Sequence, residues 1–327
     1  MGPYDTAMIS FSPIEAESNQ TNFRLAHISD PHLSSLNDIS WRLLANKRIL
    51  GYLSWRFSRR FIHRLDVLNS LIDDLESTGS NHLVISGDLT HIGTPSECEQ
   101  VSTWLAQLGN AKDITVIPGN HDCYIKDNEA TTIGRWSAYM HGDAALGSSQ
   151  HPIFPSFRKR GPLAIIGLST ASPTAPFFAS GRLGDKQIDT LAQLLKQTEQ
   201  QGLFRVVVLH HGPLSDSNKF QKRLTDAAQF RSVIQSCGAE LILHGHGHYP
   251  VCGWLQGKNS KVPVLGAASA SLLSKSHTKR AGYNIYNVNT TESGWRVQVE
   301  SRRYDSNHAN FEKNEILEFT LPRNIKA

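Results

Sequence analysis

The sequence contains few cysteines and no long apolar run. Four cysteines occur among 327 residues, without a C-x-x-C pair or a regular spacing. This excludes a disulfide scaffold and predicts reduced thiols in a cytoplasmic protein. No apolar run approaches the roughly 18 residues that cross a bilayer. Residues 1–20 lack the basic and apolar stretches of a secretory signal, and we expect a flexible tail there, followed by one domain over residues 21–327.

Acidic residues are absent from one segment, residues 41–64, although the chain as a whole is almost neutral. The net charge is +4, and this segment holds seven of the 33 lysines and arginines. The rest of the chain therefore carries 26 basic and 29 acidic residues. This uneven distribution of charge indicates that an anionic partner binds at residues 41–64, and not that the protein as a whole is basic.

Aromatic residues are interleaved with the basic ones in residues 41–64, and the segment is compatible with a helix inserted into the domain. The aromatic residues are Trp41, Tyr52, Trp55, Phe57 and Phe61. Such a helix suits an anionic membrane surface, a cap over a pocket, or a solvated face whose aromatics pack on the domain. Nucleic acid is a less favoured partner, because the rest of the chain is slightly acidic.

Short apolar runs alternate with amphipathic stretches along most of the chain. Strands are predicted at 23–29, 82–86, 114–117, 163–168, 204–209 and 240–243, and helices at 65–76, 96–108, 185–198 and 225–236. Beyond residue 261 short β-like runs follow one another. The pattern predicts a layered α/β fold in which the C-terminal strands contribute to a second sheet.

Side chains that suit metal ligation follow five of the predicted strands. In chain order they are Asp30, His32, Asp88, Asn120, His210, His246 and His248, with His121 and Asp122 next to Asn120. Ligands gather beyond the carboxyl ends of strands in α/β folds, so we expect these residues to converge. Carboxylate, amide and imidazole groups bind divalent cations, and a two-metal site suits hydrolysis of phosphate esters.

The strongest local signal is the stretch L-H-G-H-G-H at residues 243–248. Its histidines alternate with glycines, which allow the backbone to approach an ion closely. Asp88 has two carboxylate oxygens and is suited to bridging two cations about 3.5–4 Å apart. His210 is nearer its strand than His211, so we assign His210 the ligand role and His211 a supporting or substrate-binding role.

The ordered motifs D-x-H, G-D, G-N-H-D, H and G-H-x-H, over residues 23–249, resemble those of the calcineurin-like metallophosphoesterase superfamily. The resemblance implies a four-layer αββα sandwich with two mixed β-sheets flanked by helices. It also implies two divalent metal ions (Mn, Fe or Zn). One would be held by Asp30, His32, Asp88 and His248, and the other by Asp88, Asn120, His210 and His246.

The same resemblance implies a reaction. A water or hydroxide bridging the ions would attack phosphorus in line with the leaving oxygen, because the ions lower the pKa of that water. His121 would hydrogen-bond a phosphate oxygen or protonate the leaving oxygen. Asp122 would orient His121 or cap the following segment.

The substrate class is narrowed by the segments S-G-D-L-T at 86–90 and G-T-P-S at 93–96, which resemble the bacterial cyclic-nucleotide phosphodiesterase-like branch. H-H-G-P at 210–213 is similar to that branch's H-H-P-P, with glycine in place of one proline. We therefore expect hydrolysis of a small phosphodiester, such as a cyclic nucleotide, with His211 and Arg223 as candidate substrate contacts.

Two other functions are compatible with the sequence. One is a membrane-associated pyrophosphohydrolase acting on a lipid-linked nucleotide diphosphate of the UDP-diacylglucosamine type, which would use residues 41–64 at the membrane. The best-known enzymes of that type have arginine where His121 stands, which counts against it. The other is a non-catalytic scaffold, which is disfavoured because His121 and all seven candidate ligands are present.

Overall fold

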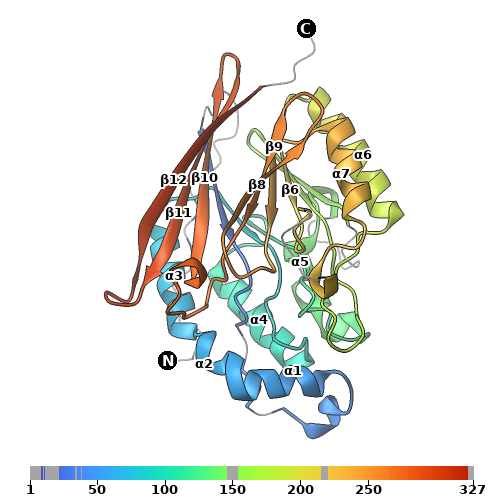
Figure 1. Cartoon of the computed structure of the whole chain (residues 1–327), viewed down its shortest axis with the longest axis vertical. Coiled ribbons are helices and arrows are strands. Elements are labelled where there is room, and N and C mark those ends of the chain that lie inside the picture. Colours follow the sequence, from blue (N-terminus) through green and yellow to red (C-terminus); the bar gives the residue numbers. More distant parts are fainter. Residues whose placement is uncertain are drawn as a thin grey trace.

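Two six-stranded β-sheets pack face to face between two layers of helices (Figure 1). The computed structural model describes residues 9, 11, 22–33, 35–37, 39–145, 154–214 and 220–322. Most of the expected tail, residues 1–20, lies outside the described residues, but Ile9 and Phe11 are described and pack against the core. The four layers confirm the αββα sandwich expected from the sequence.

The first sheet combines three strands from the first part of the chain with three from its end. They are β1 (Asn22–Ile28), β2 (His82–Ile85), β3 (Ile114–Val116), β10 (Gly282–Thr291), β11 (Gly294–Asp305) and β12 (Asn310–Pro322). Their order is β12-β11-β10-β1-β2-β3. β1, β2 and β3 are parallel, so their carboxyl ends lie at one edge of the sheet.

The second sheet is built from the middle of the chain. Its strands are β4 (Ser156–Arg160), β5 (Leu163–Gly167), β6 (Phe204–Val208), β7 (Leu241–His244), β8 (Val251–Gln256) and β9 (Lys261–Gly266). Their order is β4-β5-β6-β7-β9-β8, and the four central strands are parallel. The sequence did not predict the antiparallel edge strands β4 and β8, because their charged or partly exposed residues lack an apolar run.

Helices cover the outer face of each sheet (Figure 1). The longer ones are α3 (Leu65–Ser77), α4 (Pro95–Leu108), α6 (Asp185–Gln200) and α7 (Ala227–Cys237), with a short α5 (Ser137–Met140). Three buried layers result, each filled by large side chains. Trp104 lies between the first sheet and its helices, and Trp295 lies between the two sheets. Phe230 of α7 lies in the layer between the second sheet and helices α6 and α7. Single turns of 3₁₀ helix are η3 (Glu129–Thr131), η4 (Ile133–Trp136), η5 (Asp143–Ala145), η6 (Phe220–Lys222) and η7 (His277–Lys279).

The start of α4 fixes the loop that follows β2. Thr94 and Glu97 form a capping box, in which each side chain accepts a hydrogen bond from the other residue's backbone N–H. Pro95 occupies the first helical turn, where its missing N–H costs nothing. The Glu97 carboxylate also accepts from the backbone N–H of His91. The local sequence thereby holds residues 88–94 in one conformation.

Residues 41–62 form a separate helical insertion, which lies at one end of the molecule (Figure 1). It consists of η1 (Trp41–Leu44), α1 (Arg48–Ser54), a π-helical turn η2 (Trp55–Arg59) and α2 (Arg60–Ile62). Of its aromatic residues, Trp55 is buried and Tyr52 half-buried against a small cluster with Leu36 and Ile92. Arg48 is buried as well, and its guanidinium donates to the carbonyl of Ile92 and to Asp127.

Two features of the sequence have direct counterparts in the fold. No helix in the described part of the chain has the length and hydropathy needed to cross a membrane. The four cysteines all lie in described segments and are unpaired, as their irregular spacing predicts.

A buried ion pair joins the beginnings of β6 and β7. The Arg205 guanidinium donates to both carboxylate oxygens of Glu240, at 2.7 and 2.8 Å, and also to the carbonyl of Cys237. The two side chains are 1% and 6% exposed. This pair fixes the relative position of two strands whose far ends carry His210 and His246.

Replacing Glu240 by alanine should destabilise the fold strongly, because it leaves a buried guanidinium without its counter-ion. We expect a loss of about 3–5 kcal/mol in the free energy of unfolding, measured by urea denaturation. Lys258→Ala is the matched control. It removes the half-exposed ion pair with Glu199 and should cost about 1 kcal/mol or less. Equal effects of the two substitutions would contradict this prediction.

Candidate metal centre

The carboxyl ends of β1, β2 and β7 bring four of the sequence-predicted ligands together. One ligand atom from each of Asp30, His32, Asp88 and His248 lies within 4.8 Å of all the others. His248 Nε2 is 3.2 Å from Asp30 Oδ1 and 3.3 Å from His32 Nε2. Four donors from three strand ends thus surround one point, as a cation site requires.

A second set of donors lies on the other side of Asp88. His210, which follows β6, places its Nε2 3.3 Å from Asp88 Oδ2. Rings of His210 and His246 meet edge to face, with centroids 5.2 Å apart. The same Asp88 oxygen is 4.0 Å from His32 Nε2 in the first set. One carboxylate therefore stands between two groups of imidazoles.

Backbone carbonyls fix the tautomers of the two innermost histidines. Nδ1 of His32 lies 2.8 Å from the carbonyl of Thr90, and Nδ1 of His210 lies 2.7 Å from the carbonyl of Ser86. A carbonyl only accepts, so each Nδ1 carries the proton that it donates. In the neutral ring Nε2 then presents its lone pair to the site, which is the arrangement found in metal-ligating histidines.

Several buried atoms at this site make no hydrogen bond of good geometry with the described residues, although Asp30 Oδ1 and His210 Nε2 lie 3.2 and 3.3 Å from His248 and Asp88. They are Asp30 Oδ1, Asn120 Oδ1, His210 Nε2 and His246 Nε2. Leaving a buried polar atom unpaired costs about 1–3 kcal/mol, so four in one place require an explanation. All four belong to expected ligands, and oxygen and imidazole nitrogen are donors that Mn, Fe and Zn accept. The donor set therefore fits metal binding.

The ligand-bearing loops adopt strained backbone conformations. In the described segments seven residues other than glycine have positive φ, and five of them are expected ligands: Asp30, His32, Asp88, His246 and His248. Such conformations are rare outside glycine and cluster at functional sites. Gly119 shows how tightly the loops pack, since a Cβ there would collide with the Asp88 carboxylate.

The carboxylates of the site favour positive charge beside them. Although burial alone would raise it, the neighbouring His248 lowers the pKa of Asp30 to about 2. Although burial would lower it, the Asp88 carboxylate raises the pKa of the His210 imidazole to about 9. Burial and then Asp88 raise the pKa of Asp122 to about 7. Buried carboxylates placed so close together are stabilised by cations.

His121 borders an open cleft of about 370 Å³ above the two donor sets. Its Nδ1 donates to the carbonyl of His91, and its Nε2 accepts from the Arg59 guanidinium at 2.9 Å. Burial and then Arg59 hold the pKa of His121 well below its ordinary value. The same cleft is lined by four expected ligands and three cationic side chains: Asp88, Asn120, His246, His248, Arg59, Lys222 and Lys279. A molecule in the cleft therefore meets these ligands, His121 and the three cationic groups.

The other sequence-predicted site residues lie outside the cleft lining. The Asp122 carboxylate accepts from the backbone N–H groups of Thr90 and Gly119, so it ties two ligand loops together. His211 is fully buried, with its ring nitrogens bonded to Thr170 Oγ1 and the carbonyl of Ala179. Arg223 is exposed and stacks on Phe220. Substrate contact by His211 and Arg223 remains a prediction, whereas this geometry gives Asp122 a positioning role.

Position 212 holds glycine where the bacterial cyclic-nucleotide phosphodiesterase-like branch has proline, and packing around this position explains why. A Cβ at Gly212 would come within 2.9 Å of the His244 ring, so a larger residue would push this ring or the loop away. The glycine thus accommodates the first histidine of the 243–248 stretch, His244.

Sequence reasoning missed four residues of the site, one of which is Lys279 in the cleft lining. His63 packs edge-on against His32, with ring centroids 4.5 Å apart, and lies in a possible ligand group with His32 and His248. Arg59 and Lys222 reach the cleft. None belongs to a recognisable motif. Arg59 and His63 lie within the basic segment 41–64, for which a cap over a pocket was one of the alternatives.

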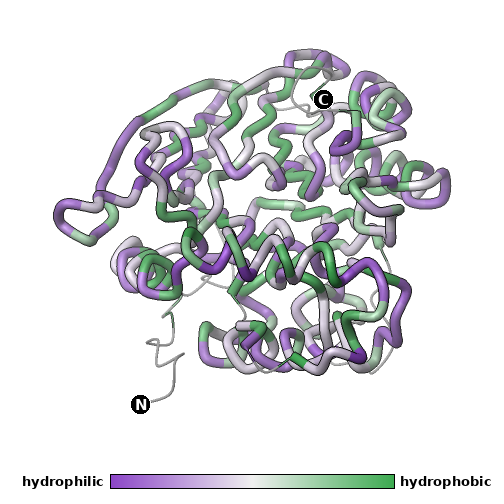
Figure 2. Tube along the Cα trace, turned by 60° about the horizontal axis from the view of Figure 1, so that its bottom comes forward, coloured by the Kyte–Doolittle hydropathy of each residue, from purple (hydrophilic) through white to green (hydrophobic). Residues whose placement is uncertain are grey.

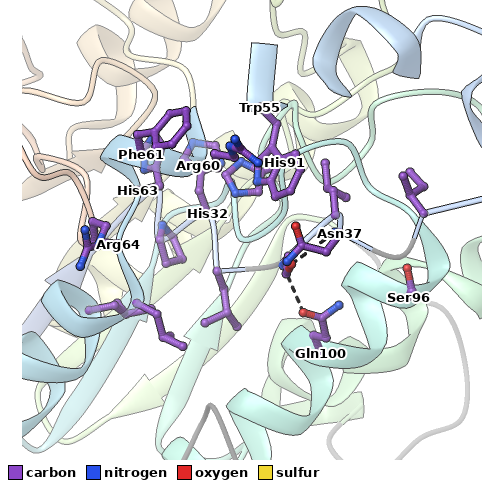
Figure 3. Close-up of a pocket in the computed structure, with 17 residues that line it drawn as sticks. His32, Asn37, Trp55, Arg60, Phe61, His63, Arg64, His91, Ser96 and Gln100 are labelled. Atoms are coloured by element: carbon purple, nitrogen blue, oxygen red, sulfur yellow. Dashed lines mark hydrogen bonds between the residues drawn. The ribbon is translucent and has the colours of Figure 1, made fainter. Parts of the chain in front are cut away.

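A larger cavity of about 790 Å³ lies behind His32 and His63 (Figure 3). Trp55 and Phe61 of the helical insertion contribute to its lining, as does Gln100 of α4. Arg60 and Arg64 add two guanidinium groups. The cavity therefore combines apolar and cationic surface next to the first donor set.

Comparison with known proteins agrees with this geometry. A family model described as calcineurin-like phosphoesterase matches residues 23–250. A probable cyclic nucleotide phosphodiesterase of Synechococcus sp. is 26% identical over 242 residues, covering 73% of this chain and 84% of the relative. The chain belongs to the calcineurin-like phosphoesterase family, as the ordered motifs indicated. It is a metal-dependent phosphoesterase.

Solved structures share the fold at low sequence identity. A dimetal phosphatase from Danio rerio superposes with a TM-score of 0.53 and 12% identity, covering 91% of this chain and 98% of the other. GAP50, described as the anchor in the inner membrane complex of Plasmodium, gives a TM-score of 0.51 with 12% identity, covering 94% and 92%. These likenesses extend over both sheets and support the layered architecture.

Binding of metal should stabilise the fold, because it engages buried atoms that otherwise lack partners. We expect added Mn²⁺ to raise the unfolding temperature, with about 2.7 kcal/mol gained at a hundredfold excess over Kd. Asp88→Asn should abolish this shift and lower the bound metal, measured by elemental analysis of the full chain. His308→Ala, in an exposed group with Asp305 and Glu312, is the control and should behave as the wild type. Full metal content in Asp88→Asn would refute the assignment.

Proposed function

We propose that the chain is a dinuclear metal-dependent phosphodiesterase that cleaves a small phosphodiester. The observation that carries this proposal is the position of Asp88 Oδ2, 3.3 Å from His210 Nε2 and 4.0 Å from His32 Nε2. A carboxylate between two imidazole groups is suited to two cations about 3.5–4 Å apart. Four unpaired buried donor atoms on both sides of it support the same arrangement.

The expected ligands divide between two ions. Asp30, His32, Asp88 and His248 would hold one, and Asp88, Asn120, His210 and His246 the other. When bound, such ions polarise phosphoryl oxygens and lower the pKa of water. The donor types suit Mn, Fe or Zn. The chain's contribution is to hold these donors on strained, tightly packed loops, so that little rearrangement is needed on binding.

The cleft supplies the groups that would bind and orient a phosphodiester anion. The Arg59 guanidinium and the Lys222 ammonium line it beside His121. Arg59 donates to His121 Nε2, and a phosphate oxygen at this place would accept hydrogen bonds from the guanidinium instead. His121, released from Arg59, would take up a proton from water at Nε2 beside the bound anion, and this imidazolium could then donate to a phosphate oxygen or protonate the leaving oxygen.

A cyclic nucleotide or a similar diester is the favoured substrate class. The 370 Å³ cleft lies within the range of small-molecule sites. The Synechococcus relative, described as a probable cyclic nucleotide phosphodiesterase, matches 84% of its own length to this chain. A small diester also needs no groups beyond the ligands, His121 and the three cationic side chains of the cleft.

A lipid-linked nucleotide diphosphate is a second candidate, favoured by the 790 Å³ cavity. This cavity lies beside His32 and His63 and has both apolar side chains and two arginines in its lining. It would suit the apolar part of an amphiphilic substrate. Such a molecule has a phosphoanhydride bond, so the products separate the two candidates.

Hydrolysis of bis-p-nitrophenyl phosphate should depend on metal and on His121. We expect turnover with added Mn²⁺, loss of turnover after chelation, and a fall of about 10²–10⁴-fold in kcat for His121→Ala. Cyclic nucleotides, glycerophosphodiesters and a lipid-linked nucleotide diphosphate should be assayed side by side, with the cyclic nucleotides cleaved fastest. Metal-loaded protein that cleaves none of these substrates would favour the scaffold alternative.

Arg59 should contribute to recognition of the phosphodiester anion. We expect Arg59→Ala to lower kcat/KM about tenfold to a hundredfold, because a charge-assisted hydrogen bond is lost. Arg59→Lys should recover only part of this, since lysine lacks the planar fork of donors. Arg296→Ala, which removes an exposed arginine paired with Glu318, should leave kcat/KM unchanged. An Arg59→Ala enzyme with wild-type kcat/KM would show that the guanidinium serves packing alone.

A further inference from the structure

Exposed apolar side chains are concentrated at one end of the molecule. Eleven large hydrophobic side chains are exposed in the described part of the chain, and six belong to the helical insertion. Phe57 is 74% exposed and Trp41 75%. Three more lie in two nearby loops. The nine are Trp41, Ile49, Leu53, Phe57, Phe61, Ile62, Phe177, Phe178 and Phe220.

Four of them form a stripe along the insertion. Ile49, Leu53, Phe57 and Phe61 follow one another at intervals of four residues, which places them on one face of a helix. The opposite face is the one that packs on the domain, through Trp55 and buried Arg48. A surface helix normally turns its apolar stripe inward, so an outward stripe marks an interaction surface. Figure 2 brings this end of the molecule forward and shows hydrophobic and hydrophilic positions alternating along the segment.

The two loops with exposed phenylalanines adjoin the insertion and the cleft. Lys47 Nζ donates to Thr174 Oγ1 and to the carbonyl of Phe178. The backbone N–H of Ala179 donates to the carbonyl of Gln221, which joins the second loop to the first. Arg59 and Ile62 of the insertion, Ala179 and Lys222 all line the cleft. The exposed apolar side chains therefore border the mouth of the metal centre on two sides.

The segments around the mouth carry positive charge only. Residues 41–64, 174–181, 220–223 and 272–281 contain twelve lysines and arginines and no aspartate or glutamate, and two of the twelve, Arg48 and Arg64, pair with acids outside these segments. Arg42 and Arg56 are exposed, and within the described segments no acidic side chain pairs with them or with Arg60. The Arg60 guanidinium lies over the ring of Phe61, with its carbon 4.5 Å from the ring centre. Cations thus alternate with apolar side chains around the opening.

We propose that this face, the helical insertion with the loops at 174–181 and 220–223, docks on an anionic lipid bilayer. Aromatic and aliphatic side chains that project from a helix enter the boundary between headgroups and acyl chains. Arginines beside them bind lipid phosphates. Nucleic acid would use stacked aromatics and a groove, but leucine and isoleucine in the stripe give no stacking surface. An anionic lipid surface can bind both the exposed apolar side chains and the arginines beside them.

Docking through this face would place the mouth of the cleft against the bilayer surface. The docked face surrounds the cleft, so the mouth would open toward the headgroups, and phosphoryl groups at the bilayer surface would have the shortest path to it. This inference goes beyond the proposed phosphodiesterase activity and does not depend on it. Vesicle binding is measured without turnover, so either proposal can fail alone.

Co-sedimentation of the full chain with vesicles tests the proposal. Vesicles of phosphatidylcholine with phosphatidylglycerol should bind the wild type, and phosphatidylcholine alone should not. The double variant Leu53→Gln with Phe57→Gln keeps helix propensity and should reduce binding to the anionic vesicles roughly tenfold. Arg42→Gln with Arg56→Gln should weaken binding and its dependence on salt.

A matched control uses the exposed apolar residues that lie elsewhere. Trp254→Thr with Ile316→Thr changes residues of β8 and β12 that are 46% and 45% exposed, and this variant should bind vesicles as the wild type does. Turnover of bis-p-nitrophenyl phosphate by each variant reports that the site is intact. Wild-type protein that stays in solution with anionic vesicles would overturn the proposal. So would an equal loss of binding in the control variant, or binding to single-stranded RNA in preference to vesicles.

Discussion

The carboxylate of Asp88 is the constraint around which the rest of the site is arranged. It is held at the carboxyl end of β2, between imidazoles contributed by both sheets. Its Oδ1 accepts from the backbone N–H of His121, which fixes its orientation. Backbone hydrogen bonds join the loop after β1 to the loop after β2. The N–H of Asp30 donates to the carbonyl of Gly87, and the N–H of His32 donates to the carbonyl of Asp88. The two sheets must therefore stack in one register for the donor sets to form.

This cluster lowers the stability of the folded state, and packing elsewhere in the fold compensates for the loss. Five ligand residues with positive φ and four buried unpaired atoms all oppose folding. Three apolar layers, filled by residues such as Trp104, Trp295 and Phe230, supply the stabilisation. The buried Arg205–Glu240 pair lies at the far end of β6 and β7 from the ligands. Strain is thus concentrated at one end of the strands and rigid support at the other.

The sequence predicted the parts of the structure that depend on local patterns. The central strands, the four long helices and the layered fold followed from apolar runs and amphipathic periodicity, which tertiary packing here reinforces. The expected ligands could be identified because each follows a strand directly. Edge strands β4 and β8 lack that signal, since β4 carries arginines at buried positions and β8 is mostly exposed or half-buried and contains a glycine. Arg59 and His63 could not be identified either, because their place at the cleft results from the path of residues 41–64 across the domain.

The helical insertion links the chemistry of the cleft to the surface around it. Arg59 lies on the π-helical turn and touches His121, while Phe57, two residues earlier, is exposed. A π-helical turn changes the angle between successive residues, and such turns are frequent at functional sites. It allows one short segment to direct a guanidinium inward and an aromatic ring outward. A partner that bound the outer stripe and moved the turn would also shift the free energy of the Arg59–His121 contact, because Phe57 of the stripe and Arg59 both belong to the turn Trp55–Arg59. Binding at the surface and recognition of phosphate in the cleft would then be coupled through this turn, and the coupling would act equally in both directions.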